Sequence, residues 1–215
     1  MEATFLSTWG SRSGRAENFF QVGKEEKSPR MVHCIAAKNP NNKISWMCRE
    51  IARKLTEWGH AERIYIGGDA TSQKEDVKLE KGDDMFRLII NELGKLGFKA
   101  IRRTTESNPS VRASADFFNS LLEGNVEGMT FGVDDSCRVA IADYENTKED
   151  KNGKVDKKTE TDPITKVSYQ PWGHFVDLTR YFLVNTFATE YHKYQTGSKA
   201  FANIQQGKRT SKHGF

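Results

Sequence analysis

Between residues 44 and 133 the sequence alternates between segments with helical periodicity and short apolar runs. Apolar residues recur at helical spacing in the segments 44–58, 86–96 and 108–124. A strand-like run follows each segment: "RIYIG", "FKAIRR" and "MTFGV". Because parallel neighbouring strands need such crossover connections, the alternation predicts parallel pairing in the middle of one sheet.

The first 37 residues carry a different pattern, with three apolar runs separated by turn residues: "ATFLSTW", "ENFFQVG" and "RMVHCIAA". This spacing is typical of an antiparallel meander. We therefore expect an α/β fold whose mixed sheet has antiparallel leading strands and flanking helices. Residues 146–168 are rich in lysines and acids around Asn152-Gly153, which predicts an exposed hairpin or a mobile loop. Residues 171–194 predict one helix of about five turns.

The length of 215 residues favours one domain, residues 1–192, and a basic tail, residues 193–215. The tail holds no acid, so it is suited to attract phosphates, although a solvated tail that contacts nothing has the same composition. No run approaches the roughly 20 apolar residues of a membrane span, and the first residues lack a signal-peptide pattern, so we expect an intracellular protein with no membrane contact. The three cysteines lack a CxxC pair and predict reduced core thiols.

Asp69 follows the apolar run Ile64-Tyr65-Ile66 and two glycines. The carboxyl end of a central strand is where open α/β sheets hold their ligands, and glycines let a ligand approach the backbone. An aspartate that caps the next turn gives the same local sequence, and for an isolated motif that structural interpretation is favoured.

Asp177 lies near the start of the predicted last helix, with His174 one turn before it and Tyr181 one turn after it. An acid in a first turn is stabilised by the helix dipole without any ligand. The position borders the apolar stripe of this helix, however, so Asp177 is expected to be partly buried and to need a cation. Two carboxylates from a strand end and a helix make an oxygen site for Mg²⁺ or Mn²⁺.

Five stretches occur in the order that is seen in the nuclease domain of phage large terminase subunits: "RIYIGGDATSQ", "SNPSVRASADFFNSLL", "VDDSCRVAIADYE", a lysine-bearing polar loop and "WGHFVDLTRYF". The sequence resembles that ribonuclease H-like nuclease from about Phe19 to Tyr181. The Gly-Asp turn and the His-x-x-Asp-x-x-x-Tyr helix are the specific parts of the resemblance.

The resemblance implies a divalent-metal endonuclease that cleaves concatemeric duplex DNA in the cytoplasm of an infected host cell. Three acids bind the metals in that family, and Asp69 and Asp177 match the second and the third. His174 would orient Asp177 or the leaving oxygen. The sequence contains no GxxxxGK[ST] motif, so the ATPase domain or subunit would be a partner, together with the small terminase subunit and the portal.

The acid of the first strand is missing from the sequence. The strand "FLSTWGSRSG" presents Ser7, Thr8, Trp9 and Gly10 where the family has an aspartate. A replacement could come from four other acids: Glu17, Asp134, Asp135 or Asp143. Of these we favour Asp135 or Asp134 over Glu17, although for both acids an Asp-Asp-Ser turn that caps the next helix is the favoured interpretation.

Cutting any DNA sequence requires contacts with phosphates rather than with base edges. The candidates are basic residues of the polar loop and of the run "AIRRTT": Lys151, Lys154, Lys157, Lys158, Arg102 and Arg103. The acids of the same loop leave it almost neutral, so a solubilising loop is the alternative interpretation.

Two other functions fit the sequence. A domain of the same fold that has lost its first acid would guide DNA or help to assemble a motor without cutting. A small-molecule α/β domain would receive a nucleotide or phosphate at Gly67-Gly68, but no GxGxxG follows any strand.

Overall fold

The computed structural model describes residues 3–10, 14–22, 27–38, 41–60, 63–73, 84–151, 155–156, 158–164, 166 and 168–197. For residues 3–10, 14–15, 38 and 73 it describes the backbone alone. No helix within these ranges is long and apolar enough to cross a membrane.

A six-stranded mixed sheet forms the centre of the molecule, in the order β5-β4-β1-β2-β3-β6. Its strands are β1 (Ala3–Gly10), β2 (Gly14–Val22), β3 (Arg30–Lys38), β4 (Arg63–Gly68), β5 (Lys99–Arg102) and β6 (Gly132–Val133). The leading strands β1, β2 and β3 pair antiparallel. Strands β1, β4 and β5 run parallel to one another, and β6 runs parallel to β3. The mixed sheet predicted from the sequence is confirmed.

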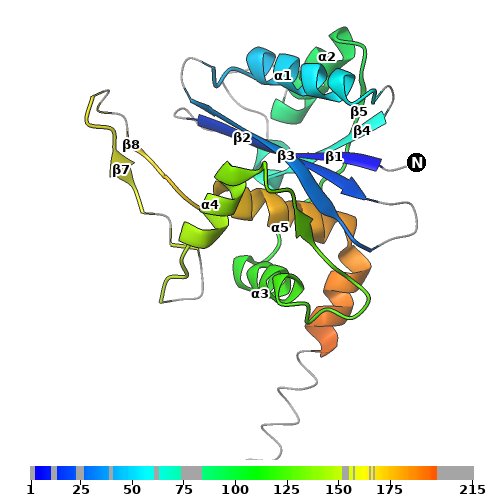
Figure 1. The fold of residues 1–215 in the computed structure, drawn as a ribbon, viewed down its shortest axis with the longest axis vertical. Helices are drawn as coiled ribbons and strands as arrows, with labels where there is room; N and C mark the ends of the chain where they lie inside the picture. Colours follow the sequence, from blue (N-terminus) through cyan, green and yellow to red (C-terminus); the bar gives the residue numbers. More distant parts are fainter. Residues whose placement is uncertain are drawn as a thin grey trace, which may run out of the picture.

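Helices cover both faces of the sheet, with α1 and α2 on one side and α3, α4 and α5 on the other (Figure 1). Their bounds are α1 (Ile44–Glu57), α2 (Met85–Lys95), α3 (Val111–Leu122), α4 (Arg138–Asn146) and α5 (His174–Thr186). The order Asn108-Pro109 in the sequence predicts a helix that starts with Asn108 as its cap. The start of α3 differs, because Ser110 is the N-cap and accepts from the backbone N–H of Ala113.

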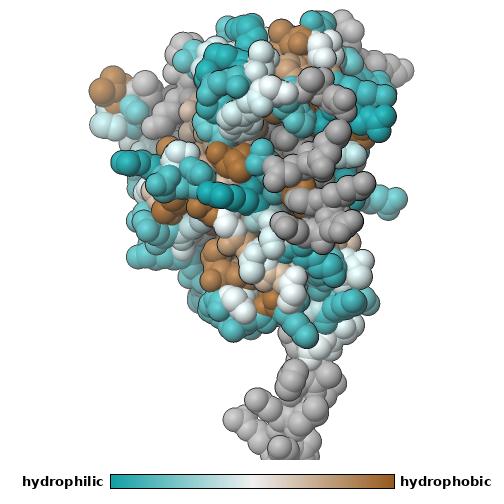
Figure 2. All heavy atoms as spheres, turned by 45° about the vertical axis from the view of Figure 1, so that its right-hand side comes forward, coloured by the Kyte–Doolittle hydropathy of each residue, from teal (hydrophilic) through white to brown (hydrophobic). Residues whose placement is uncertain are grey.

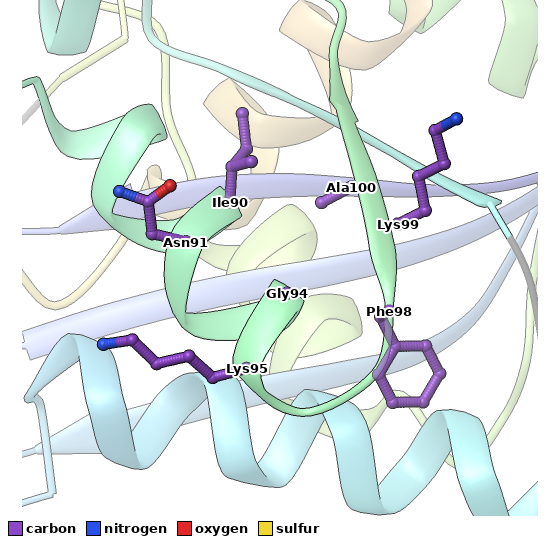
Figure 3. Close-up of a pocket in the computed structure, with 7 residues that line it drawn as sticks. All are labelled: Ile90, Asn91, Gly94, Lys95, Phe98, Lys99 and Ala100. Atoms are coloured by element: carbon purple, nitrogen blue, oxygen red, sulfur yellow. The ribbon is translucent and has the colours of Figure 1, made fainter.

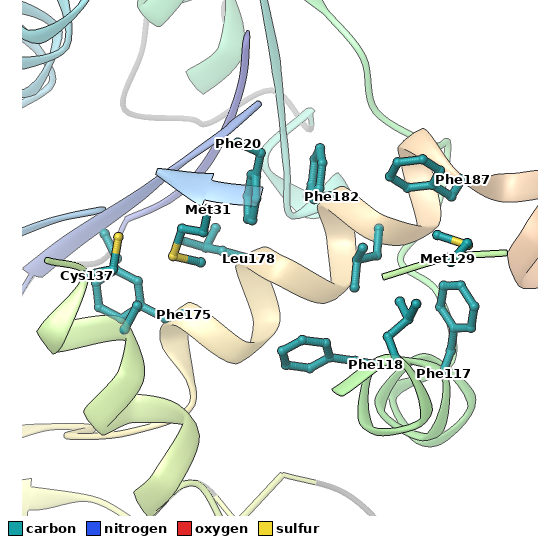
Figure 4. Close-up of a cluster of buried hydrophobic side chains, with 14 residues drawn as sticks. Phe20, Met31, Phe117, Phe118, Met129, Cys137, Phe175, Leu178, Phe182 and Phe187 are labelled. Atoms are coloured by element: carbon teal, nitrogen blue, oxygen red, sulfur yellow. The ribbon is translucent and has the colours of Figure 1, made fainter. Parts of the chain in front are cut away.

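Two apolar clusters hold these layers together. The first lies under α1 and α2, where Met47, Ile51 and Leu55 form the buried stripe of α1. The second lies between the sheet and α3 to α5 (Figure 4). In it the ring of Phe20 from β2 stacks on Phe182 of α5 at a centroid distance of 3.8 Å.

The face drawn in Figure 2 is mostly hydrophilic, with small hydrophobic areas between the hydrophilic ones.

The C-terminal helical region is interrupted at Phe187, so the single long helix expected from the sequence is two segments. Phe187 leaves helical geometry at φ −116° and ψ 44°, and residues 188–197 are helical again. The break lets the Phe187 ring pack edge-on against Phe182 in the second cluster. The second segment packs beside α3, where the rings of Tyr191 and Tyr194 contact Phe117. Residues 198–215, most of the predicted basic tail, lie outside the described ranges.

The polar excursion between α4 and α5 contains a short antiparallel hairpin, β7 (Glu160–Thr161) and β8 (Ser168–Tyr169). An isolated bridge between Glu149 and Val155 precedes it. The hairpin projects from the body of the molecule beyond the start of α5 (Figure 1). An exposed hairpin was one of the two forms predicted for this segment.

Candidate active site at the end of strand β4

The two glycines before Asp69 are required by close packing of the backbone. A Cβ on Gly67 would lie 2.9 Å from the carbonyl oxygen of Arg103, in the chain that follows β5. Gly68 has a φ of 150°, which side chains rarely allow. These reasons account for the glycines without a nucleotide or phosphate, and they remove the main sequence argument for a small-molecule domain.

Asp69 is held in one orientation at the carboxyl end of β4. Its Oδ1 accepts from the backbone N–H of Thr71 at 2.8 Å and from the Thr71 hydroxyl at 2.7 Å. The same oxygen accepts from Nδ2 of Asn108 at 2.7 Å, while Oδ1 of Asn108 accepts from the N–H of Ala70. The carboxamide of Asn108 therefore braces the whole turn. From the sequence, Asn108 before Pro109 indicated a helix cap and not this role.

Asp177 lies in the first turn of α5 and is buried against a buried cation. Its Oδ1 accepts from Nη1 of Arg180 at 2.5 Å, and the Arg180 side chain is 1% exposed. Nε of Arg180 donates to the Ser114 hydroxyl of α3 at 2.9 Å. The buried position and the need for a cation were both expected from the sequence. The cation is Arg180, and its spacing of three residues from Asp177 is a pattern of helical ion pairs that was available in the sequence.

Tyr181 connects the two carboxylates electrostatically. Burial raises the pKa of the Tyr181 hydroxyl most, and the negative charges of Asp177 and then Asp69 raise this pKa further. Asp69 and Asp177 are far apart in the sequence, and both raise the pKa of the same hydroxyl group. Asn108 and Ser114, which bond to Asp69 and to the partner of Asp177, lie just before and within the first turns of α3. The end of β4, the start of α3 and the start of α5 therefore form one polar region.

His174 faces another part of α5. Its Nε2 lies 2.8 Å from the carbonyl oxygen of Gln170, and its charge acts on Asp143. These contacts place His174 at the start of α5 beside Asp143.

Asp143, one of the four acids considered as a replacement, caps α5. Its carboxylate accepts from the backbone N–H groups of Gly173 at 2.7 Å, Phe175 at 2.8 Å and Val176 at 3.0 Å. Burial raises its pKa, while these three donors and His174 act in the opposite direction. Four N–H groups at a helix start lack partners within the helix, and Asp143 satisfies three N–H groups at the start of α5. The described hydrogen bonds of the Asp143 carboxylate therefore stabilise the start of α5.

Asp134 and Asp135 follow β6 at the opposite edge of the sheet from β5. Asp134 accepts from the Ser136 N–H and hydroxyl and pairs with Arg30 at 3.2 Å. Strands β3, β2 and β1 separate β6 from β4, which at the usual strand spacing is about 19 Å. The structure therefore does not bring Asp135 to Asp69.

Glu17 is buried on β2, and the register places it opposite Thr8, which lies opposite Gly68. Its neighbours show which face it occupies. Asn18 donates to Thr179 of α5, whereas Phe19 packs in the cluster under α1. Since side chains alternate along a strand, Glu17 faces α1 and not α5. Within the described ranges, no three His, Cys, Asp or Glu side chains form a group that could hold a metal ion.

The predicted DNA-binding residues fall into two groups. Arg102 pairs with Asp84 and lies 5.0 Å from the Phe86 ring centroid, and Arg103 lies over Tyr65. Lys151 is exposed, and Lys158 is 78% exposed with Asp156 at 3.6 Å. The remaining two, Lys154 and Lys157, lie outside the described residues.

A pocket of about 560 Å³ lies between α2 and β5 (Figure 3). Its lining consists of Ile90, Asn91, Gly94, Lys95, Phe98, Lys99 and Ala100. Lys99 begins β5 and pairs with Arg63 at the start of β4, so the pocket lies toward the amino ends of these parallel strands. Asp69 lies at their carboxyl end, and the pocket is separate from the candidate active site.

The sequence matches no protein-family model, and no curated protein matches it. Solved structures do resemble the chain, and phage large terminases are among them. The nuclease domain of the P22 large terminase gives a TM-score of 0.51 at 15% identity, covering 84% of this chain and 78% of that chain. The large terminase of a thermophilic bacteriophage gives a TM-score of 0.50 at 14% identity, covering 85% of this chain.

The chain spans 38% of the length of that second terminase. At these identities the likeness shows the fold alone. The chain has a ribonuclease H-like fold of the kind found in the nuclease domains of phage large terminases, as its sequence led us to expect.

Proposed function

We propose that this chain is the metal-dependent endonuclease domain of a viral DNA-packaging terminase, which cleaves concatemeric duplex DNA. The observation that carries the proposal is the position of the two acids: Asp69 follows β4, Asp177 lies in the first turn of α5, and β4 and α5 pack against each other. The terminase-like fold supports the same assignment. Asp69 and Asp177 would hold Mg²⁺ or Mn²⁺, because carboxylate oxygens suit these hard cations.

We leave Asp135 out of the proposed ligand set. The ligands of one ion each lie about 2–2.6 Å from it, and β4 and β6 are about 19 Å apart, so Asp69 and Asp135 cannot bind the same ion. A bound ion would polarise a phosphoryl oxygen and lower the pKa of a water molecule.

The protein's own residues prepare the site for an anionic substrate. Thr71 and Asn108 fix the orientation of Asp69, and Arg180 fixes Asp177. The raised pKa keeps the Tyr181 hydroxyl protonated at neutral pH, so it can donate a hydrogen bond to a phosphate oxygen. His174 contacts the carbonyl oxygen of Gln170 at the start of α5, and from there it would orient Asp177 or the leaving oxygen.

DNA would be held through phosphates along the excursion that leads into α5. Lys151 and Lys158 are exposed there, whereas Arg102 is engaged by Asp84 and is the weaker candidate. By its likeness to terminases, the domain would work with an ATPase domain or subunit, a small terminase subunit and the portal, at the procapsid in the host cytoplasm.

Plasmid cleavage in Mn²⁺ tests the proposal. Asp69→Asn and Asp177→Asn should each reduce cleavage by about 100-fold or more, because losing even an outer partner of a metal ligand typically costs 10–100-fold. Asp135→Asn is the matched control and should cleave like the unmodified chain. Circular dichroism checks that each variant is folded. Full cleavage by folded Asp69→Asn and Asp177→Asn chains would overturn the assignment.

A second function is a non-cutting domain that guides DNA or assembles the motor. It is favoured by the ion pair of Asp177 with Arg180, which neutralises one of the two proposed ligands. Calorimetric titration with Mn²⁺ separates the two functions. Tight Mn²⁺ binding supports the nuclease, whereas salt-sensitive DNA binding without Mn²⁺ binding supports the guiding domain.

A further inference from the structure

Two of the three cysteines meet on the α5 side of the sheet, although 103 positions separate Cys34 from Cys137. Cys34 lies on β3, and Cys137 is the residue before α4. The backbone places the start of α4 beside β3. The N–H of Asp134 donates to the carbonyl of Met31, the N–H of Cys137 donates to the carbonyl of Asp134, and α4 packs against β3. Cys137 is fully buried in the second apolar cluster, and the partly buried Cys34 packs against that cluster.

The two thiols are unlike each other because of their hydrogen bonds. A hydrogen bond from Cys137 lowers the pKa of Cys34 most, and the N–H groups of Ala140 and Val139, in the first turn of α4, lower it further against the effect of burial, to about 7. The same contact and burial raise the pKa of Cys137. Tyr144 of α4 packs against the same apolar cluster as the two cysteines. A thiolate at a helix start is the usual form of a reactive cysteine.

We propose that Cys34 and Cys137 form a reversible redox pair, in which Cys34 is the attacking thiolate and Cys137 the resolving thiol. The oxidant would be a low-molecular-weight disulfide such as oxidised glutathione. The Cys34 thiolate attacks one sulfur of glutathione disulfide, forms a mixed disulfide and releases one glutathione thiolate. Cys137 then loses its proton to the released thiolate and attacks the Cys34 sulfur, which forms the Cys34–Cys137 disulfide and releases the second glutathione.

The bond would tie the first turn of α4 to β3. Helix α4 carries Asp143, whose carboxylate caps the start of α5. Oxidation of the pair would therefore fix the element that supports α5, whatever reaction the domain performs. This inference depends on the thiol geometry alone and not on the proposed nuclease activity.

Intact-mass spectrometry of the native chain in oxidised glutathione tests the pair. We expect the mass to fall by two hydrogen atoms, and peptide mapping to join Cys34 to Cys137. Cys137→Ser should instead gain one glutathionyl group at Cys34, and Cys34→Ser should form neither product. Cys48→Ser is the matched control, because Cys48 is buried on α1 at the other face of the sheet, and this variant should still form the disulfide.

Three results would overturn the proposal. A glutathionyl group that persists on the unmodified chain would show that Cys137 does not resolve it. A bond that involves Cys48 would show that the assigned pair is not the reactive one. No reaction of the native chain, under conditions in which the denatured chain reacts, would show that Cys34 is not accessible as a thiolate.

Discussion

The two faces of the sheet bury different kinds of side chain. The face under α1 and α2 is built mainly from aliphatic and aromatic residues such as Met47, Ile51 and Leu55, although it also buries Glu17. The face under α3, α4 and α5 has an apolar cluster of similar extent, but it also buries Asp143, Asp177 and Arg180 with hydroxyl and amide groups around them. A buried charge is costly unless it is paired, so the second face retains groups that packing alone would not favour. Among the described residues, the α5 side therefore holds most of the buried charges.

The largest effect should come from breaking the buried ion pair on the α5 side. Asp177→Leu leaves Arg180 buried without its carboxylate and should lower the free energy of unfolding by about 3–5 kcal/mol. The double variant Asp177→Leu/Arg180→Leu should recover most of this loss, because no uncompensated charge remains. Urea denaturation of the unmodified chain, of Asp177→Leu, of Arg180→Leu and of the double variant gives the coupling energy. Equal destabilisation of the single and double variants would show that the pair does not act as a unit.

Shortening a buried apolar side chain on the α1 side should destabilise the chain without involving any charge. Ile51→Ala should lower the free energy of unfolding by about 2–5 kcal/mol through lost burial and a cavity, because Ile51 is 1% exposed. This loss should not change with salt, and Mn²⁺ titration of the folded variant should match the unmodified chain. Urea denaturation at low and high salt checks the first point. A change in the Mn²⁺ response would contradict the separation of the two faces.

A smaller effect is expected where the site is braced by a neutral side chain. Asn108→Ala removes one of three donors to Asp69 and leaves the N–H of Ala70 without its acceptor. We expect a loss of about 1–3 kcal/mol, the usual cost of an orphaned polar group. Thermal denaturation measures the stability, and plasmid cleavage measures the positioning of Asp69. An Asn108→Asp variant keeps an acceptor for Ala70 but not the donor, so it separates the two roles.

The two faces also differ in how much of their structure could be predicted from the sequence. Elements with strong periodicity, such as α1 and the alternating strands β4 and β5, were predicted because local pattern and tertiary burial agree there. The α5 side depends on contacts between distant residues. Asn108 reaches Asp69 across 39 positions and Asp143 reaches α5 across 30 or more, and no local pattern records such bonds.

Asp69 and Asp177 were identified because a strand end and a helix start are local signals. Asp135 could not be judged in the same way, because its distance from Asp69 is set by the order of the strands. That order places β6 beside β3, at the far edge from β5. Similarly, the capping role of Asp143 depends on α4 and α5 packing together and not on its own sequence context.

The last and smallest expected effect is the pH dependence that Asp143 adds on the α5 side. Its pKa in the folded chain is raised by burial above that of an ordinary aspartate. Between these two pKa values the folded chain binds a proton that the unfolded chain has lost, so the contribution of this group to stability falls as pH rises through that window. Urea denaturation across acidic pH should show this slope, and Asp143→Asn should remove it while keeping one acceptor for the α5 N–H groups. An unchanged slope in Asp143→Asn would mean that the N–H donors and His174 cancel the effect of burial on this pKa, and that the α5 side carries no net electrostatic penalty for its cap.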